Sequence, residues 1–215
     1  MTTPTVLWHT TLEQSGGPTA PLVVLLHGRG ADERDIATLA DRLPVGPAYV
    51  ALRAPIAEGG GFAWFANQGI GRPLPASLAT SVAWFTTWLD SVAGDRQPVV
   101  LVGFSGGATF AGGAVLAEPS RYAGLATLYA TLPFDAGVPT TPNRLAGLPV
   151  LLVQGSTDRV IPTDLQARSW AYLHESSGAT LFARRTPGGH GLTATDVNLL
   201  ADWLSALPAD PPSHD

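Results

Sequence analysis

The sequence predicts an α/β fold, in which a mainly parallel, doubly wound sheet carries helices on both faces. Two observations lead to this prediction. Short apolar runs rich in β-branched residues recur along the chain, and patterns typical of amphipathic helices lie between several of them. In such folds the functional groups gather at the carboxyl ends of the strands. The predicted parallel strands cover residues 22–26, 48–52, 99–104, 124–132, 150–154 and 180–184.

The remaining elements follow from position and spacing. Residues 6–11 precede the first parallel strand and are predicted to form an antiparallel edge strand. Apolar side chains repeat every three or four positions over 78–92 and again over 200–207, as on helices packed against a sheet. Thr163 and Gln166 have the spacing of a capping box, which predicts a helix through about residue 174.

The chain length suits one domain. With 215 residues and 45% hydrophobic content, the segment 1–207 is long enough for a single domain with a substantial core. Residues 208–215 contain three prolines and are expected to be disordered. One internal segment, 55–77, holds five glycines, three prolines and several aromatic residues without clear periodicity. We expect a long irregular loop that forms part of a substrate site, with a packed surface loop as the alternative.

Composition excludes several functions. A net charge of −5 with 13% charged residues leaves no basic surface for nucleic acid. The chain has no lysine and no cysteine, so lysine or thiolate nucleophiles and disulfides are excluded. The five histidines are scattered, and neither a metal nor a cofactor is expected. Residues 1–10 have neither the basic start nor the apolar stretch typical of a secretory leader, and no apolar run is long enough for a membrane span, so we expect a cytoplasmic protein.

The most informative motif is Gly-Phe-Ser-Gly-Gly at residues 103–107, directly after a predicted strand. A serine on a tight strand-to-helix turn has its hydroxyl pushed clear of the backbone, and the flanking glycines avoid clashes across the turn. Ser105 is therefore the candidate nucleophile.

Ser105 needs a base and an orienting acid, in the chain order serine, acid, histidine. Asp158 follows the predicted strand 150–154 in a Gly-Ser-Thr-Asp turn, and His190 follows the strand 180–184 in a glycine-rich loop. Taken singly, each has a structural explanation, as a turn aspartate or a loop histidine. Three such residues in order, each after its own strand, favour a catalytic triad. The alternative acids are Glu58, Asp135 and Asp164, and the alternative base is His174.

The predicted strand 22–26 leads into His27-Gly28-Arg29-Gly30. A turn of this kind can direct a backbone N–H toward the nucleophile. In acyl-transfer enzymes one oxyanion donor comes from this loop and the other from the residue after the nucleophile. We therefore expect the backbone amides of Arg29 and Gly106 to form the oxyanion hole, and His27 to be a buried residue that holds the loop by hydrogen bonds.

Four blocks carry a family resemblance: Leu-Leu-His-Gly-Arg-Gly-Ala-Asp (25–32), Gly-Phe-Ser-Gly-Gly-Ala (103–108), Gln-Gly-Ser-Thr-Asp-Arg-Val-Ile-Pro (154–162) and Gly-Gly-His-Gly-Leu (188–192). The chain resembles the phospholipase/carboxylesterase family of α/β-hydrolases over most of residues 20–207. The resemblance implies an α/β-hydrolase fold without a large cap. It also implies an ester pocket lined by Phe62, Trp64, Phe65, Phe104, Ile161 and Leu192. Many relatives carry glutamine where this chain has Gly106.

These features predict a serine carboxylesterase that hydrolyses small to medium, largely apolar esters through an acyl-enzyme. The expected partner is a small-molecule ester, and the sequence leaves a monomer and a homodimer open. A lysophospholipase or acyl thioesterase would use the same residues. A dienelactone-type hydrolase, which usually has a cysteine nucleophile, and a catalytically silent ligand-binding module are the further alternatives.

Overall fold

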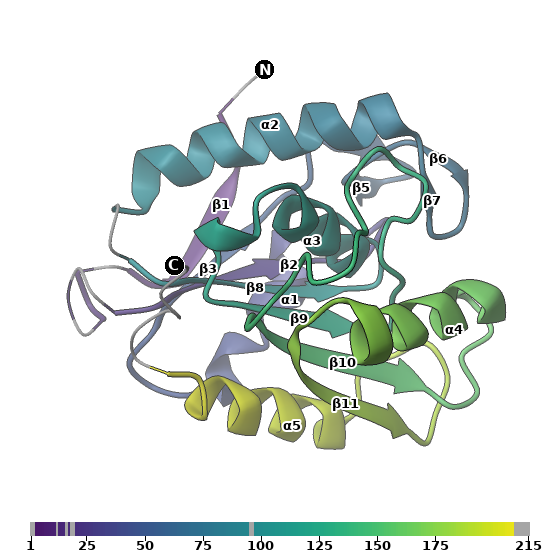
Figure 1. Cartoon of the computed structure of the whole chain (residues 1–215). Coiled ribbons are helices and arrows are strands. Elements are labelled where there is room, and N and C mark those ends of the chain that lie inside the picture. Colours follow the sequence, from purple (N-terminus) through teal and green to yellow (C-terminus); the bar gives the residue numbers. More distant parts are fainter. Residues whose placement is uncertain (1–2, 12, 16, 18–19, 95–96, 209–215) are drawn as a thin grey trace.

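A mostly parallel sheet forms the centre of the molecule (Figure 1). The computed structural model describes residues 3–11, 13–15, 17, 20–94 and 97–208. Within these ranges the sheet has seven strands in the order β1-β3-β2-β8-β9-β10-β11, and only the β1–β3 pairing is antiparallel. The strands are β1 (Val6–Thr10), β2 (Leu22–Leu26), β3 (Ala48–Leu52), β8 (Val99–Phe104), β9 (Gly124–Leu128), β10 (Pro149–Gly155) and β11 (Thr180–Thr186). The predicted α/β class and the antiparallel edge strand are confirmed.

Strand register brings the candidate functional segments to one edge of the sheet. In the parallel pair β2–β8, Leu26 lies opposite Gly103, so the loop after β2 and the turn with Ser105 leave the sheet side by side. In the parallel pair β10–β11, Gly155 lies opposite Thr186, so the two segments that follow also start together.

Helices cover both faces of the sheet (Figure 1). The helices are α1 (Glu33–Ala37), α2 (Pro75–Val92), α3 (Gly106–Ala117), α4 (Thr163–Ala171) and α5 (Ala194–Ser205), with single turns at Ala40–Arg42, Pro119–Arg121 and Tyr172–Ser176. On β2, Leu22, Val24 and Leu26 belong to the core cluster that includes α2 and α3 residues, whereas Val23 and Leu25 belong to the cluster with α1 and α5.

The predicted strand 124–132 is too long, because β9 ends at Leu128. The next residue, Tyr129, has a φ of 55°, which turns the chain out of the extended conformation. Residues 129–134 nevertheless remain buried, so the apolar run continues past the end of the strand. Burial alone therefore could not reveal where β9 stops.

The predicted capping box at the start of α4 is wrong. Pro162 is the N-cap residue, and no side chain makes a hydrogen bond at this cap. The Gln166 side chain instead donates to the backbone carbonyl of Ile161 at 2.8 Å and to that of Asp158 at 3.4 Å. Gln166 thus ties α4 to the turn that carries Asp158.

The segment 55–77 is not the irregular loop that its composition predicts. It contains two small hairpins, β4 (Ile56–Glu58) with β5 (Gly61–Ala63) and β6 (Asn67–Gly69) with β7 (Arg72–Pro73), and α2 begins within it. Strands of two or three residues are too short to show a period. The strand β5 also pairs with the loop after β2, since Gly30 N donates to Phe62 O and Phe62 N donates to Ala31 O.

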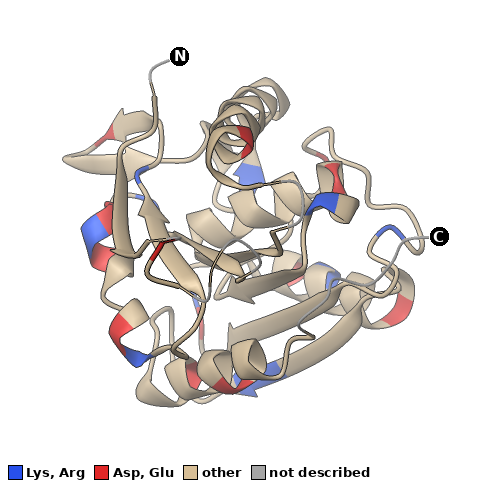
Figure 2. Ribbon diagram, turned by 90° about the vertical axis from the view of Figure 1, so that its left-hand side faces the viewer, with Lys and Arg blue, Asp and Glu red and all other residues tan. Residues whose placement is uncertain are grey.

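Charged residues are few and scattered in Figure 2, with acidic and basic residues interspersed over helices and loops. No helix among the described residues is long and apolar enough to cross a membrane. In the same part of the chain, no group of three or more His, Asp or Glu side chains is placed to hold a metal ion. Apart from Pro208, the tail 208–215 lies outside the described residues.

Candidate active site

Ser105 occupies the sharp turn between β8 and α3 in a conformation that is rare for a residue with a side chain. Its φ is 51° and its ψ is −120°. A non-glycine residue held there costs about 1–3 kcal/mol, and such outliers cluster at functional sites. The neighbouring glycines are sterically required: a Cβ on Gly103 would lie 2.5 Å from Ala108 N, and one on Gly107 would lie 2.3 Å from Leu26 O.

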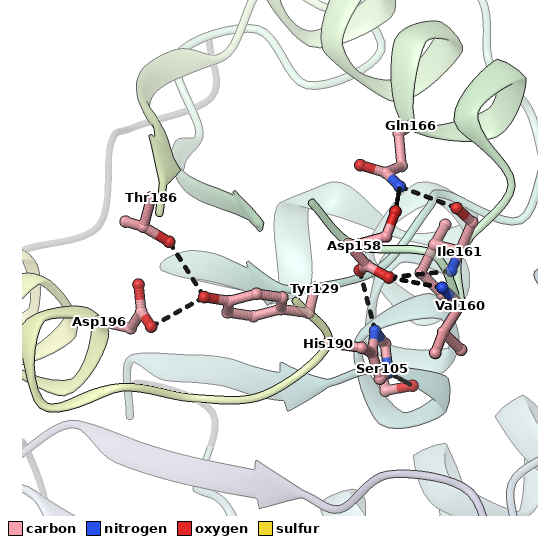
Figure 3. Close-up of polar contacts among 9 residues, drawn as sticks. All are labelled: Ser105, Tyr129, Asp158, Val160, Ile161, Gln166, Thr186, His190 and Asp196. Atoms are coloured by element: carbon pink, nitrogen blue, oxygen red, sulfur yellow. Dashed lines mark hydrogen bonds and ion pairs between the residues drawn. The ribbon is translucent and has the colours of Figure 1, made fainter. Parts of the chain in front are cut away.

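Ser105, His190 and Asp158 form a continuous chain of hydrogen bonds (Figure 3). The distance from Ser105 Oγ to His190 Nε2 is 2.8 Å, and that from His190 Nδ1 to Asp158 Oδ2 is 2.9 Å. A carboxylate only accepts hydrogen bonds, so Nδ1 carries the ring hydrogen and Nε2 is left as the acceptor for the serine hydroxyl. The three side chains lie in the order that proton transfer from Ser105 requires.

The carboxylate of Asp158 is bound through both oxygens. Oδ2 accepts from His190, and Oδ1 accepts from the backbone N–H of Val160 at 2.8 Å and of Ile161 at 3.2 Å (Figure 3). The side chain is 1% exposed, against 15% for that of His190. The turn therefore fixes the orientation of the carboxylate before any ligand arrives.

The alternative acids are occupied elsewhere. Glu58, Asp135 and Asp164 form ion pairs with Arg29, Arg168 and Arg72, respectively. The ring of the alternative base, His174, is bonded through Nδ1 to Trp170 O at 2.9 Å. Among the described residues, Asp158 is the only acidic side chain bonded to His190.

The backbone of Arg29 lies close to that of Gly106, the residue after Ser105. A Cβ built on Gly106 would lie 3.3 Å from Arg29 N, so the loop after β2 passes close over the start of α3. Neither amide donates to a protein acceptor within the described part of the chain. Unpaired N–H groups at a helix start are suited to bind a negatively charged oxygen.

The Arg29 side chain is held by Glu58 and by the carbonyl of Phe65, which sequence reasoning missed. Its guanidinium donates to both carboxylate oxygens of Glu58, at 2.5 Å for Nε–Oε1, and to Phe65 O at 3.0 Å. The loop that carries the Arg29 amide is thereby tied to β4 and to the segment after β5. No local pattern could reveal this pair, because its members are 29 positions apart.

His27 is buried and holds the same loop, as predicted. Its Nδ1 lies 2.7 Å from Gly28 O, and its Nε2 accepts from the N–H of Ala54 at 3.0 Å. Burial lowers the pKa of His27 below its ordinary value, against smaller opposing effects of the Gly28 carbonyl and nearby carboxylates. A neutral ring, protonated at Nδ1, satisfies both contacts.

A cavity of about 450 Å³ lies beside Ser105 and His190. Its lining is largely apolar and comes from the loop after β2, from α1 and the two residues after it, from the turn with Ser105, and from the loop between β11 and α5. The lining residues are His27, Gly28, Arg29, Ala31, Asp35, Ile36, Thr38, Leu39, Phe104, Ser105, His190 and Leu192. Of the six residues expected to form the ester pocket, this cavity includes Phe104 and Leu192.

The structure places the other four expected pocket residues elsewhere. Trp64 is 1% exposed and stacks on Phe110, and Phe65 is 3% exposed within the core. The ring of Phe62 lies under the guanidinium of Arg53, and Ile161 is buried beside Asp158 without lining the cavity. Trp64 Nε1 donates to His27 O at 2.8 Å, so Trp64 supports the loop from the core side.

Comparison with known proteins places the chain in a family. A model described as phospholipase/carboxylesterase matches residues 8–207. A Bacillus subtilis protein named "Putative hydrolase MhqD" is 25% identical over 191 residues, which cover 87% of this chain and 94% of the relative.

Solved structures of similar fold include the Bacillus cereus carboxylesterase, with a TM-score of 0.80, 22% identity and coverage of 94% of this chain and 93% of that chain. A carboxylesterase from Mesorhizobium loti has a TM-score of 0.79 and 24% identity, and the match covers 95% of this chain and all of the other. The shared architecture is the α/β-hydrolase fold, without a large cap. With a family model that spans nearly its whole length, the chain belongs to the phospholipase/carboxylesterase family of hydrolases.

Proposed function

We propose that this chain is a serine carboxylesterase that hydrolyses small to medium, largely apolar carboxylic esters. The observation that carries the proposal is the hydrogen-bonded series from Ser105 through His190 to Asp158, which starts at a strained turn beside a cavity. A purely structural serine would need neither the strain nor an accepting imidazole.

In the first half of the reaction, Ser105 Oγ attacks the ester carbonyl carbon and His190 Nε2 takes the hydroxyl proton. Asp158 keeps the ring in the required tautomer and stabilises the imidazolium. The carbonyl oxygen becomes negative and accepts from the amides of Arg29 and Gly106. The tetrahedral intermediate then expels the alcohol, which takes the proton from Nε2, and an acyl group remains on Ser105.

In the second half, a water molecule gives a proton to Nε2 and attacks the acyl carbon. The second tetrahedral intermediate releases Ser105, whose oxygen recovers the proton, and the carboxylic acid leaves. All proton transfers in both halves of the reaction therefore pass through His190.

The cavity supports the proposed substrate class. Ile36, Leu39, Phe104 and Leu192 contribute apolar surface next to the nucleophile. Apolar lining with a few polar groups is typical of pockets for small organic ligands. The exposed carboxylate of Asp35 stands in the same lining, which disfavours esters that carry a second negative charge.

The test is hydrolysis of p-nitrophenyl esters of graded acyl length by the wild type and Ser105→Ala. We expect kcat to fall by about 10⁴- to 10⁶-fold in the variant, with an unchanged circular dichroism spectrum. A fluorophosphonate should label Ser105 alone. Undiminished hydrolysis by Ser105→Ala, or a label on another residue, would overturn the proposal. Faster cleavage of thioesters than of matched oxygen esters would make the chain a thioesterase that uses the same residues.

A further inference from the structure

The buried Tyr129 is bonded directly to one end of the loop that carries His190 and, through Asp196, to the other end. This loop, residues 187–192, joins β11 to α5, so its ends are Thr186 and Thr193. The hydroxyl of Tyr129 lies 3.0 Å from Thr186 Oγ1 and donates to Asp196 Oδ2 at 2.9 Å (Figure 3). The same carboxylate oxygen accepts from Thr193 N and from Thr193 Oγ1, each at 2.7 Å.

The ring of Tyr129 also packs against the His190 ring. It meets the His190 ring edge to face, with centroids 6.2 Å apart, and it lies 6.1 Å from the ring of Phe104. A Cβ on Gly155 would lie 2.7 Å from Tyr129 Cε1 and 2.4 Å from Gly189 O. The His190 loop, the end of β10 and the tyrosine are therefore packed in direct contact, with little room for the loop to move.

This arrangement has features that reduce stability. Tyr129 has a positive φ of 55° although it is not glycine. Asp196 is fully buried, and its Oδ1 has no hydrogen-bond partner among the described residues. Burial raises the pKa of Asp196, but the hydrogen bonds from Thr193 and Tyr129 outweigh burial and hold it below its ordinary value. A buried, partly satisfied charge is expensive, and core packing of a tyrosine does not require one.

We propose that Tyr129 and Asp196 are positioning residues for His190. Together with Thr186 and Thr193 they fix both ends of the His190 loop, so that Nε2 reaches Ser105 while Nδ1 reaches Asp158. This inference rests on the proposed function, because it assigns a role in bringing the base to the nucleophile. Neither residue touches the ester.

The experiment compares Tyr129→Phe with Tyr49→Phe in the full chain, using a p-nitrophenyl ester. Tyr49 is a matched control, because its buried hydroxyl donates to Pro44 O at 2.7 Å and lies outside the site. We expect Tyr129→Phe to lower kcat by about 10- to 100-fold, the range for a displaced catalytic group, with KM changed less than about twofold. Tyr49→Phe should lower the melting temperature to a similar extent and keep the wild-type kcat.

A spectroscopic measurement makes the test independent of turnover. The His190 Nδ1 proton, bonded to a carboxylate, should give a downfield proton resonance in the wild type and in Tyr49→Phe. We expect this signal to broaden or vanish in Tyr129→Phe. Should that variant fail to fold, Thr186→Val removes only one of the two phenol contacts and should show the same changes at smaller amplitude.

The outcomes separate the two proposals. A Tyr129→Phe variant with wild-type kcat and an intact downfield signal, alongside an inactive Ser105→Ala variant, overturns the positioning role and leaves the proposed function standing. Equal losses of kcat in Tyr129→Phe and Tyr49→Phe also overturn it, since a general loss of stability would then explain both. Full activity of Ser105→Ala overturns the proposed function itself.

Discussion

Arg29 is bound through its guanidinium by Glu58, while its backbone N would lie 3.3 Å from a Cβ placed on Gly106. Both side chains of the pair are more than a third exposed, at 35% for Arg29 and 41% for Glu58. Exposed pairs contribute little to stability. The pair ties the loop that contains Arg29 to β4, so we expect it to affect the position of this loop rather than stability.

The first prediction concerns this pair. Glu58→Gln should leave the melting temperature almost unchanged and lower kcat/KM by roughly 3- to 10-fold, because the Arg29 amide is then less firmly placed for the oxyanion role that we propose for it. Thermal unfolding and ester kinetics on the same sample check both parts. Asp135→Asn, which breaks the comparable exposed pair with Arg168, is the control and should retain full kcat/KM. Equal kinetics in both variants would contradict the positional role.

The second prediction concerns the acid that orients His190. Asp158→Asn should lower kcat by about 10⁴-fold, since an amide can donate to Nδ1 and so favour the wrong tautomer. The amide oxygen can still accept from Val160 and Ile161, so the fold should persist. Steady-state kinetics measure the loss. Asp164→Asn, at an exposed carboxylate paired with Arg72, should behave as wild type, and a comparable loss there would argue against a special role for Asp158.

The third prediction concerns the cavity. Leu192→Ala enlarges the space beside Ser105, so the ratio of kcat/KM for a longer acyl ester to that for a shorter one should rise by about 10-fold. A series of p-nitrophenyl esters of increasing acyl length measures this ratio. Ile161→Val is the control, because Ile161 does not line this cavity. An unchanged preference in Leu192→Ala would show that the acyl chain binds elsewhere.

The fourth prediction follows from His27. Burial lowers its pKa from 6.5, so below about pH 6.5 the unfolded chain binds a proton that the folded chain does not bind. This histidine therefore makes stability fall as the pH drops through that value. His27→Gln should be less stable at neutral pH but should lose less further stability between about pH 7.5 and 5.5. Urea unfolding across this range compares the slopes, and parallel slopes would contradict a neutral, buried His27.

The fifth prediction concerns Glu33, whose carboxylate accepts two hydrogen bonds from Arg53 at 2.6 Å. These bonds hold the pKa of Glu33 below 4.5 in the folded chain, against the opposing effect of burial. The ionised Glu33 therefore contributes fully to the free energy of unfolding above pH 4.5. This contribution is lost as the pH falls through the pKa that Glu33 has in the folded chain. Glu33→Gln should lower the melting temperature at neutral pH, and the gap to wild type should close on acidification. A gap that stays constant would rule out this linkage.

The sheet was largely predictable because strand runs in a parallel sheet are continuous and apolar. The runs at β2, β3 and β8 have the predicted bounds. The loop after β2 contains Arg29, and the turn after β8 contains Ser105. Interactions between distant segments were not predictable in this way. The bond from Tyr129 to Asp196 joins residues 67 positions apart. Asp196 belongs to the capping box that Thr193 begins at the start of α5, but a capping box does not reveal which distant hydroxyl donates to its carboxylate.

Aromatic residues were misplaced for a related reason. The composition of segment 55–77 and the family resemblance placed Trp64 and Phe65 in the substrate site, yet both are core residues of the segment after β5. In a short segment without periodicity, an aromatic ring is buried only if another part of the chain packs against it. Trp64 is buried because Phe110 from α3 stacks on it. The sequence of the segment contains no information on that neighbour.

The backbone conformation at Ser105 has a consequence for anyone who engineers this chain. A glycine tolerates a φ of 51°, so Ser105→Gly should have a higher melting temperature than the wild type, although it lacks the hydroxyl. Selection of variants for heat resistance alone would therefore favour inactive chains. A screen of this protein has to score turnover and thermal tolerance together.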